Sequence, residues 1–496
     1  MEKIIITGDS LTLDFVEKVS KNNFFVELSE DSKLKINKSR EIVEKIIASN
    51  KIVYGINTGF GFLKNVVIPE DKIEKLQENL IISHSTGVGD FFEEQISRAM
   101  LLLRVNSLAK GFSGIRLEVV QRLIDFLNLG ITPLIPCKGS VGASGDLAPL
   151  SHMILPIIGL GKVLYKSKIL DTEEVLKINK LLPIKLKAKE GLALINGTQA
   201  MCAVSSVVIS KAKRMLDISE GIAAMTVDAL KCTNQSFREE IHVIRPHKGQ
   251  LTSAKNMFNL LKGSEIMESH PDCEQVQDAY SIRCLPQVHG AVRDAIDYAE
   301  SVLVIEINSV TDNPIILPDT EEVISGGNFH GEPIAIVMDF VSIALSELAN
   351  ISERRIERMV NPSLSNGLPA FLINDGGINS GYMIAQYTAA SLVSENKSLA
   401  HPASVDSIPT SANQEDHVSM GTIASRKSYE ILKNTEYVLA IEALCASQGL
   451  DFRKPLKTGI GARFFYEKIR KEIKYLKEDR IISNDIETAR DILFCL

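Results

Sequence analysis

The chain has 496 residues, of which 45% are hydrophobic and 24% charged, a balance typical of a globular protein with a large core. Its formal net charge of -7, with no dense basic run among aromatic residues, argues against a nucleic-acid-binding surface. The odd cysteine count of 7, with no C-x-x-C pair, argues against a disulfide framework and favours a reducing compartment.

The first part of the chain mixes short elements of different types. Residues 2–7, EKIIIT, are typical of a strand, and Ser39–Ser49 has the pattern of an amphipathic helix. Residues 117–130 place Leu, Val and Ile on one helix face, and Gly130 marks the end of that helix. The opening segment has only a short apolar run, which argues against a signal peptide, so we expect a cytoplasmic protein.

Long helical windows dominate the remainder of the chain. They cover residues 198–229, 286–310, 332–360, 380–400 and 420–448. Several exceed the usual helix length of about 11–12 residues, and their wide apolar faces indicate oligomerisation. The most apolar window contains Asp339 and Glu347, which favours a buried helix over a membrane span.

The predicted fold is therefore mainly α, with a long-helix bundle core and a smaller mixed α/β N-terminal region. We predict three regions along the chain. Residues 1–200 form the mixed region, residues 201–450 form the central long-helix bundle, and residues 451–496 form a C-terminal helical cap. The loops between the long helices carry clusters of Gly, Asn, Gln, His and Tyr, and loops held by a rigid scaffold often bind ligands.

The stretch CKGSVGASGDLAPLSH, residues 137–152, contains more small residues than a turn requires. One interpretation is a flexible turn in which Ser144 caps the next helix. A chemical interpretation is that the Gly145 nitrogen attacks the carbonyl carbon of Ala143, because glycine shields its nitrogen least. Loss of two waters would then leave an imidazolone ring with an exocyclic methylene. Such an electrophile would assist the elimination of an amine by covalent catalysis.

The stretch GSVGASGDLAPLSH resembles the cofactor-forming motif of the aromatic amino acid ammonia-lyases. Six further blocks resemble this family in its order: YGINTGFG (54–61), LALINGTQ (192–199), QDAYSIRCLPQVHGA (277–291), NSVTDNP (308–314), GGNFHGEP (326–333) and TSANQEDHVSMG (410–421). The resemblance covers nearly the whole chain and implies a mostly helical homotetramer whose active sites are built from three subunits. It also implies a methylidene-imidazolone formed from Ala143, Ser144 and Gly145, with no metal and no external cofactor.

The resemblance further assigns roles to single residues. Tyr54 would be the general base on a mobile lid, although a tyrosine with a pKa of about 10 must be activated to act near neutrality. Arg283 would pair with the substrate carboxylate, since its planar fork donates two hydrogen bonds. Tyr280 would lie beside the cofactor, and Gln277 would contribute hydrogen bonds from the same side.

Two more residues complete the implied site. Asn196 would donate to the imidazolone oxygen as that oxygen gains negative charge, or it is the N-cap of the following helix. Phe329 would pack on the cofactor, or it is an ordinary core residue. The principal base stays open among Tyr54, Tyr280 and Glu415.

The choice of substrate falls to the side-chain pocket. The pair Ser83-His84 resembles that of histidine-specific members of the family, whereas tyrosine-specific members tend to have His-Leu and phenylalanine-specific members Phe-Leu. Glu415 can accept a hydrogen bond from an imidazole N–H, but it would be costly beside a phenyl ring. His84 and Glu415 therefore predict L-histidine as the small-molecule substrate, deaminated to trans-urocanate and ammonia. Ser85-Thr86 depart from the two alanines of many histidine-specific relatives, and they either reshape the pocket or cap a helix.

Two other functions stay open. One is a tyrosine or phenylalanine ammonia-lyase, or an aminomutase that returns ammonia to the β-carbon. The other is an inactive helical scaffold that binds a partner or metabolite. The histidines show no H-E-x-x-H or similar ligand spacing, so we expect no metal, and we expect neither nucleic acid nor a membrane as partner.

Overall fold

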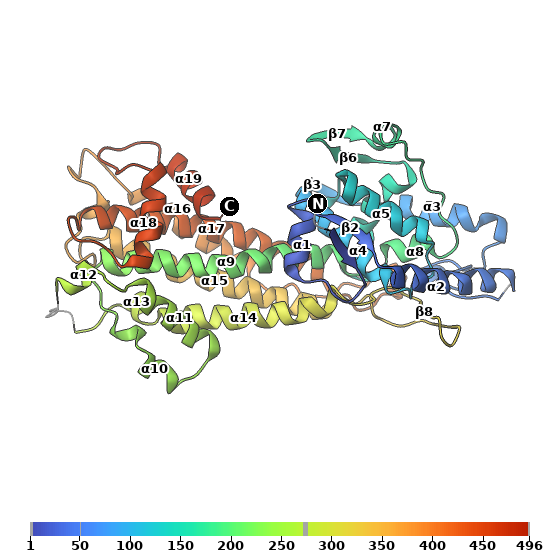
Figure 1. Cartoon of the computed structure of the whole chain (residues 1–496), viewed down its shortest axis with the longest axis horizontal. Coiled ribbons are helices and arrows are strands. Elements are labelled where there is room, and N and C mark those ends of the chain that lie inside the picture. The colour runs from blue at the N-terminus through green and yellow to red at the C-terminus, as the bar shows by residue number, and fades with distance from the viewer. Residues whose placement is uncertain (1–2, 50, 271–275, 495–496) are drawn as a thin grey trace. The chain divides into compact units, whose positions relative to one another are not determined.

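Helices account for most of the secondary structure, and the strands are few and short (Figure 1). The computed structural model describes residues 3–49, 51–270 and 276–494. The chain packs as two units: unit 1 combines Met1–Val207, Glu300–Asp339 and Pro402–Arg426, and unit 2 combines Val208–Ala299, Phe340–His401 and Lys427–Leu496. The mainly α fold predicted from the sequence is confirmed, and the three predicted regions stay a prediction.

Unit 1 contains every strand found in the described part of the chain. Its helices are α1 (Leu13–Ser20), α2 (Glu30–Ala48), α3 (Ile73–His84), α4 (Glu94–Ala109), α5 (Leu117–Leu129), α6 (Leu147–Ile154), α7 (Thr172–Ile178) and α8 (Glu190–Ile195). Its strands are β1 (Lys3–Ile6), β2 (Phe25–Leu28), β3 (Val88–Phe91), β4 (Ile131–Pro133), β5 (Pro136–Lys138), β6 (Lys162–Tyr165), β7 (Lys168–Asp171), β8 (Ile315–Leu317) and β9 (Glu322–Ile324). They pair as β1-β2, β3-β5, β4-β6-β7 and β8-β9, and only β1-β2 is parallel among these pairs.

Local sequence signals explain where the first elements begin and end. β1 lies within the predicted strand and buries alternate residues, as a half-buried strand should, while Glu2 lies outside the described residues. α2 begins at Glu30, earlier than the predicted Ser39–Ser49, because the Ser29 hydroxyl accepts a hydrogen bond from a first-turn N–H. α5 ends where the sequence predicts, at Gly130 in the left-handed conformation.

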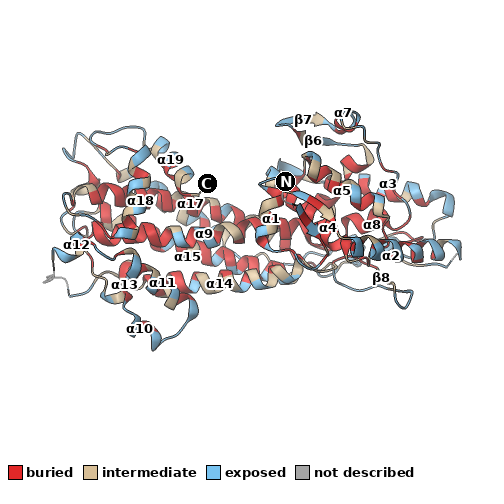
Figure 2. Ribbon diagram, viewed as in Figure 1, coloured by how far each residue is buried: buried red, intermediate tan, exposed pale blue. Residues whose placement is uncertain are grey.

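The long helices coincide with the predicted windows. They are α9 (Gln199–Ala229), α14 (Leu285–Glu306), α15 (Glu332–Val360), α16 (Met383–Leu399) and α17 (Gly421–Asp451). The shorter helices of unit 2 are α10 (Glu239–Val243), α11 (Lys248–Leu260), α12 (Glu265–Glu268), α13 (Tyr280–Arg283), α18 (Ile460–Glu472) and α19 (Ile482–Phe494). Figure 2 shows buried residues along much of α9, α15 and α17, so these helices form the core of unit 2.

A buried carboxylate joins three of the long helices within unit 2. Glu442 of α17 accepts hydrogen bonds from Arg355 of α15 at 2.6 and 2.8 Å. It also accepts from the hydroxyls of Ser352 at 2.6 Å and Thr226 of α9 at 2.8 Å. The side chains of Arg355 and Glu442 are 0% exposed, so each charge depends on the other for compensation.

One helix of the described residues, α15, is long and apolar enough to cross a membrane by length and composition alone. However, 67% of its most apolar window is buried against the protein itself. This burial agrees with the core helix expected from Asp339 and Glu347 in the same segment.

We predict that Glu442→Gln destabilises the protein by about 3–5 kcal/mol, because it leaves the buried Arg355 charge without its anion. Chemical denaturation followed by circular dichroism measures this loss. The matched control is Glu430→Gln on the exposed face of the same helix, which should change stability by less than about 0.5 kcal/mol. Equal effects of the two substitutions would contradict the assigned role of the buried pair.

Candidate active site

Two glycines bring the loop of Ala143, Ser144 and Gly145 against the turn between α8 and α9. Gly145 and Gly197 form an isolated parallel bridge, and the Asp146 N–H donates to the Gly197 carbonyl at 2.8 Å. Gly145 has a φ of 73°, and a Cβ at this position would overlap the Gly197 carbonyl. Both conditions favour glycine, so this loop can lie directly against the Gly197 backbone because position 145 carries no side chain.

Ser144 is held from both sides. Its carbonyl oxygen accepts a hydrogen bond from the Asn196 amide at 2.7 Å, and its hydroxyl donates to Glu415 Oε1 at 2.7 Å. The other carboxylate oxygen of Glu415 accepts from the Thr410 hydroxyl at 2.8 Å. These contacts hold the carbonyl and hydroxyl of Ser144 between two distant stretches of sequence, which carry the Asn196 amide and the Glu415 carboxylate.

Both helix-cap alternatives for these residues are wrong. α6 begins at Leu147 and its N-cap is Asp146, so Ser144 does not cap it. Asn196 is the C-cap of α8, and it does not begin α9, which starts at Gln199. The polar side chains of Ser144 and Asn196 are therefore available to each other and to the site.

A buried aspartate, Asp146, anchors the loop from behind. Its carboxylate accepts from the Ser140 hydroxyl at 3.0 Å, the Met201 N–H at 2.8 Å and the Thr422 hydroxyl. Burial raises the pKa of Asp146, and these hydrogen bonds oppose that rise. The sequence analysis did not single out this residue, although an acid within an apolar segment was the available signal.

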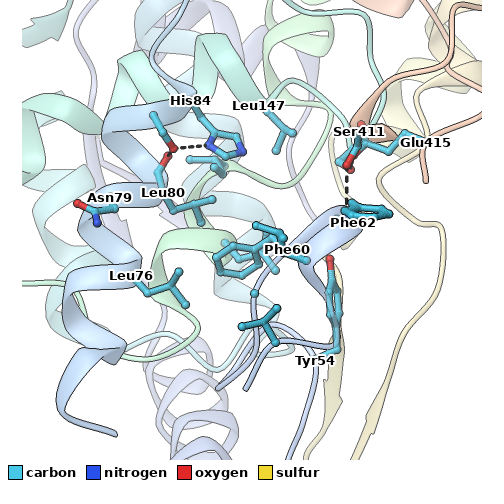
Figure 3. Close-up of a pocket in the computed structure, with 18 of the residues that line it drawn as sticks. Tyr54, Phe60, Phe62, Leu76, Asn79, Leu80, His84, Leu147, Ser411 and Glu415 are labelled. Carbon is cyan, nitrogen blue, oxygen red and sulfur yellow. Dashed lines mark hydrogen bonds between the residues drawn. The ribbon is translucent and has the colours of Figure 1, made fainter. Parts of the chain in front are cut away.

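Ser144 lines two cavities of unit 1. The larger has a volume of about 830 Å³, and Figure 3 shows Tyr54, His84 and Glu415 around it, with Phe60, Leu76 and Leu80 as apolar walls. The smaller, of about 300 Å³, is lined by residues that include Tyr54, Ser144, Asn196, Asn313, Phe329 and Glu415. Both volumes fall within the usual range of small-molecule pockets, about 300–1,000 Å³. The structure thus brings together Tyr54, His84, Ser144, Asn196, Phe329 and Glu415.

Burial shifts the pKa of two of these groups away from their charged forms. It lowers the pKa of His84, and a hydrogen bond to the Leu80 backbone and the charge of Glu415 oppose that effect. Burial also raises the pKa of Tyr54; a backbone hydrogen bond at Gly61 opposes the rise and the Glu415 charge adds to it. The site therefore presents a neutral imidazole and a neutral phenol beside a carboxylate.

The geometry can be compared with known proteins. A model of the family described as aromatic amino acid lyase matches residues 11–471. The chain belongs to the aromatic amino acid lyase family. This lyase is 56% identical to a histidine ammonia-lyase of Caldanaerobacter subterraneus, over 99% of this chain and 97% of that protein.

Solved structures of two related enzymes share the fold of this lyase. Histidine ammonia-lyase from Trypanosoma cruzi aligns with a TM-score of 0.92 and 44% identity, over 99% of this chain and 93% of that one. Tyrosine aminomutase from Streptomyces globisporus aligns with a TM-score of 0.95 and 39% identity, over 100% and 97%. Enzymes that act on different amino acids thus share this fold, so the pocket residues must decide the substrate.

Three predicted site residues of the lyase belong to unit 2. Tyr280 is 70% exposed, and the Arg283 guanidinium lies 4.4 Å from the centre of its ring. Gln277 is exposed just before α13, the short helix that carries the other two. None of the three lines the two cavities that contain Ser144.

Asn313 is a cavity residue of the lyase that the sequence analysis did not single out, although it lies in the NSVTDNP block. Its side-chain oxygen accepts from the Gly326 N–H at 2.7 Å, and its amide donates to the Ser325 hydroxyl at 3.2 Å. Asn313 therefore holds the loop that carries Phe329. The polar run before a proline was the signal for such a turn.

The first residue of the unusual Ser85-Thr86 pair caps a helix. It is the C-cap of α3, and its hydroxyl donates to the Ile81 carbonyl at 2.8 Å. Ser83 and His84 line the larger cavity, while the Ser85 hydroxyl is used by the helix end. This contact supports the helix-capping alternative over a reshaped pocket.

His330 and His417 form a stacked pair in unit 1, with ring centres 5.5 Å apart and facing nitrogens 3.4 Å apart. Across the residues the structure describes, no group of three or more His, Cys, Asp or Glu could hold a metal ion. The expected absence of a metal from the lyase stays a prediction.

We predict that His84 makes the protein more sensitive to acid. Because the folded-state pKa of His84 lies below its unfolded value of about 6.5, the unfolded chain takes up this proton first and stability falls as pH drops below that value. The drop in melting temperature between about pH 7.5 and 5.5 should be larger for the wild type than for His84→Gln. An equal drop in both proteins would contradict the prediction.

Proposed function

We propose that this lyase deaminates L-histidine to trans-urocanate and ammonia, the first committed loss of nitrogen in histidine breakdown. The observation that carries the proposal is the position of His84 and Glu415 in the same cavity as Ser144. An imidazole side chain offers one N–H donor and one acceptor nitrogen, and a carboxylate and a neutral histidine can satisfy both. The relatives named above that act on histidine support the same substrate.

Selection against other aromatic amino acids follows from unpaired polar groups. A phenyl ring between Glu415 and His84 would offer a hydrogen bond to neither of them. Sites built to pair with substrate polar groups reject analogues that lack them by roughly 10⁴–10⁵. The alternative, a tyrosine or phenylalanine ammonia-lyase or an aminomutase, fits the fold equally well but leaves the Glu415 carboxylate without a purpose in the pocket.

We infer that Ala143, Ser144 and Gly145 mature into a methylidene-imidazolone by losing two waters. The residues fit this ring: Gly145 has a positive φ and no room for a Cβ, and the Asn196 amide already donates to the oxygen that would become the ring carbonyl. When formed, the ring supplies an electrophile that makes the substrate amine a better leaving group. The Asn196 amide would stabilise negative charge on that carbonyl oxygen.

The remaining side chains bind and orient the substrate. Tyr54 lines both cavities and is our proposed base for the β-proton. Its raised pKa means that the free site holds the phenol protonated, so the approach of a cationic substrate or of Arg283 must lower that pKa before the proton moves. Phe329 supplies an apolar wall of the smaller cavity and excludes water.

We propose that the enzyme is a homotetramer in which neighbouring subunits complete each site. Tyr280 is exposed on unit 2 and Arg283 is half-buried beside it, so a second subunit can contact the accessible part of each. The α15 helix also leaves an apolar stripe exposed, with Ile336 40%, Phe340 46% and Ile343 50% accessible. Apolar surface of this kind is typical of an interface between subunits.

The proposed location is the cytoplasm. The cysteines in the described part of the chain form no disulfide with one another, and three of them, Cys202, Cys232 and Cys445, are buried. Reducing compartments keep thiols in this state. A small amino-acid substrate requires neither a membrane nor a nucleic acid.

The decisive experiment combines intact-mass analysis with a product assay. The wild type should lack the mass of two waters and should convert L-histidine to a product with the ultraviolet absorption of urocanate. Ser144→Ala has no hydroxyl to leave as the second water, so it should fail to form the methylene and should lose at least about 10³-fold in kcat, because the electrophile is absent. A lasting cinnamate-type alkene from tyrosine or phenylalanine, or a β-amino acid product, would favour the alternative.

The matched control for this experiment is Ser151→Ala. Ser151 is buried in α6, close to Ser144 in sequence, and its hydroxyl has no hydrogen-bond partner among the described residues. This variant should lose two waters and form urocanate as the wild type does. An unmodified mass for the folded wild-type chain would contradict the proposed cofactor.

We predict that Ser144→Ala and Arg283→Ala, each inactive alone, restore activity when they are co-expressed. If Ser144 and Arg283 of one site come from different subunits, random mixing leaves roughly a quarter of the sites intact. The measurement is urocanate formation by the purified mixture. Activity no higher than that of the separate variants would contradict shared sites.

A further inference from the structure

Beneath the proposed reacting loop lies a buried cation that has no part in the function proposed above. Arg104 of α4 is fully buried in unit 1. Its Nη1 donates to the Asn196 carbonyl at 2.8 Å and to Gln199 Oε1 at 2.7 Å, and its Nη2 donates to the Ala193 carbonyl. One guanidinium therefore holds the end of α8, the turn after it and the start of α9.

The same turn, at Asn196 and Gly197, forms hydrogen bonds with the reacting loop. Asn196 donates its side-chain amide to the Ser144 carbonyl at 2.7 Å, and the Gly197 carbonyl accepts from the Asp146 N–H at 2.8 Å. A Cβ on Gly197 would overlap Arg104 Nη1. The Gly197 backbone therefore lies between the Arg104 guanidinium and the Gly145 backbone, and neither contact leaves room for a side chain.

We propose that Arg104 is a positioning residue for the dehydration of Ala143, Ser144 and Gly145. Its hydrogen bonds hold the turn at Asn196 and Gly197. That turn then holds the bend of the reacting loop. This inference rests on the proposed function only in requiring that the loop dehydrates, and it does not depend on which amino acid is the substrate.

The step itself balances without an oxidant. Ring closure joins the Gly145 nitrogen to the Ala143 carbonyl carbon and expels the Ala143 oxygen with the amide hydrogens of Gly145 and Ser144. The second water takes the Ser144 hydroxyl and the hydrogen on its Cα, which leaves the methylene. Neither loss begins unless the Gly145 nitrogen lies close to the carbonyl carbon, so the rate depends on how firmly the bend is held.

Arg104 stays cationic while it is buried. Burial lowers the pKa of its guanidinium to about 10, and the charge of Asp312 opposes that effect. Asp312 is in turn paired with the buried Lys189 at 2.8 Å. A lysine at position 104 would keep the charge but would present one nitrogen to acceptors that Arg104 reaches with two. Arg104→Lys therefore tests positioning without removing the cation.

The experiment follows dehydration by intact mass after cell-free synthesis of the full chain. Arg104→Lys should lose its two waters on the order of 100-fold more slowly than the wild type, because a small displacement of reacting atoms is enough for such a loss. The matched control is Arg98→Lys, six residues earlier on α4. Arg98 is also buried and donates only to the carbonyls of Val19, Ser20 and Leu127, away from the reacting loop. The Arg98→Lys variant should dehydrate at the wild-type rate.

A second variant keeps the inference testable. Gln199→Met removes one acceptor of Arg104 and should slow dehydration less than Arg104→Lys does, while the protein folds. The inference would be overturned if Arg104→Lys dehydrated at the rate of Arg98→Lys. It would also be overturned if Arg104→Lys and Gln199→Met were recovered only as aggregates while Arg98→Lys folded. A folded wild type with unmodified mass would instead overturn the proposed cofactor, and this inference with it.

Discussion

The approach of two backbones at Gly145 and Gly197 is the constraint on which the remaining site geometry depends. Because neither residue has a side chain, the loop before α6 and the turn before α9 touch directly. Their contact leaves the Ser144 carbonyl facing the Asn196 amide and the Ser144 hydroxyl facing Glu415. Any side chain at either glycine would separate these groups, so the chemistry of the site is set first by backbone packing.

Burial then decides which groups carry charge. Burial lowers the pKa of His84 and so favours its neutral form near pH 7, while it raises the pKa of Tyr54, a phenol that is already neutral there. Neither His84 nor Tyr54 therefore gives Glu415 a positively charged neighbour. A site with one carboxylate and neutral hydrogen-bonding partners favours a polar, uncharged ring and a cationic amine, which are the two ends of histidine.

Sequence periodicity was sufficient for α15, which buries one face over the predicted 332–360 and exposes Phe340 on the other. It failed at the start of α2, where a cap at Ser29 outweighed the weak apolar pattern. Family motifs brought together Ser144, Asn196, Glu415 and His84, but they could not identify Arg104. A buried arginine acquires its role from carbonyls of other segments, and their position is a property of the folded chain alone.

Glu415 links the formation of the site to its use. Before dehydration, one of its carboxylate oxygens accepts from the Ser144 hydroxyl and the other from Thr410. Under the proposed maturation, the Ser144 hydroxyl leaves as water, so the first oxygen loses its partner while Thr410 still holds the second. A partly buried carboxylate oxygen that loses its donor is less stable, and an imidazole N–H can restore the lost hydrogen bond. Maturation of the loop would thereby create the vacancy that selects histidine.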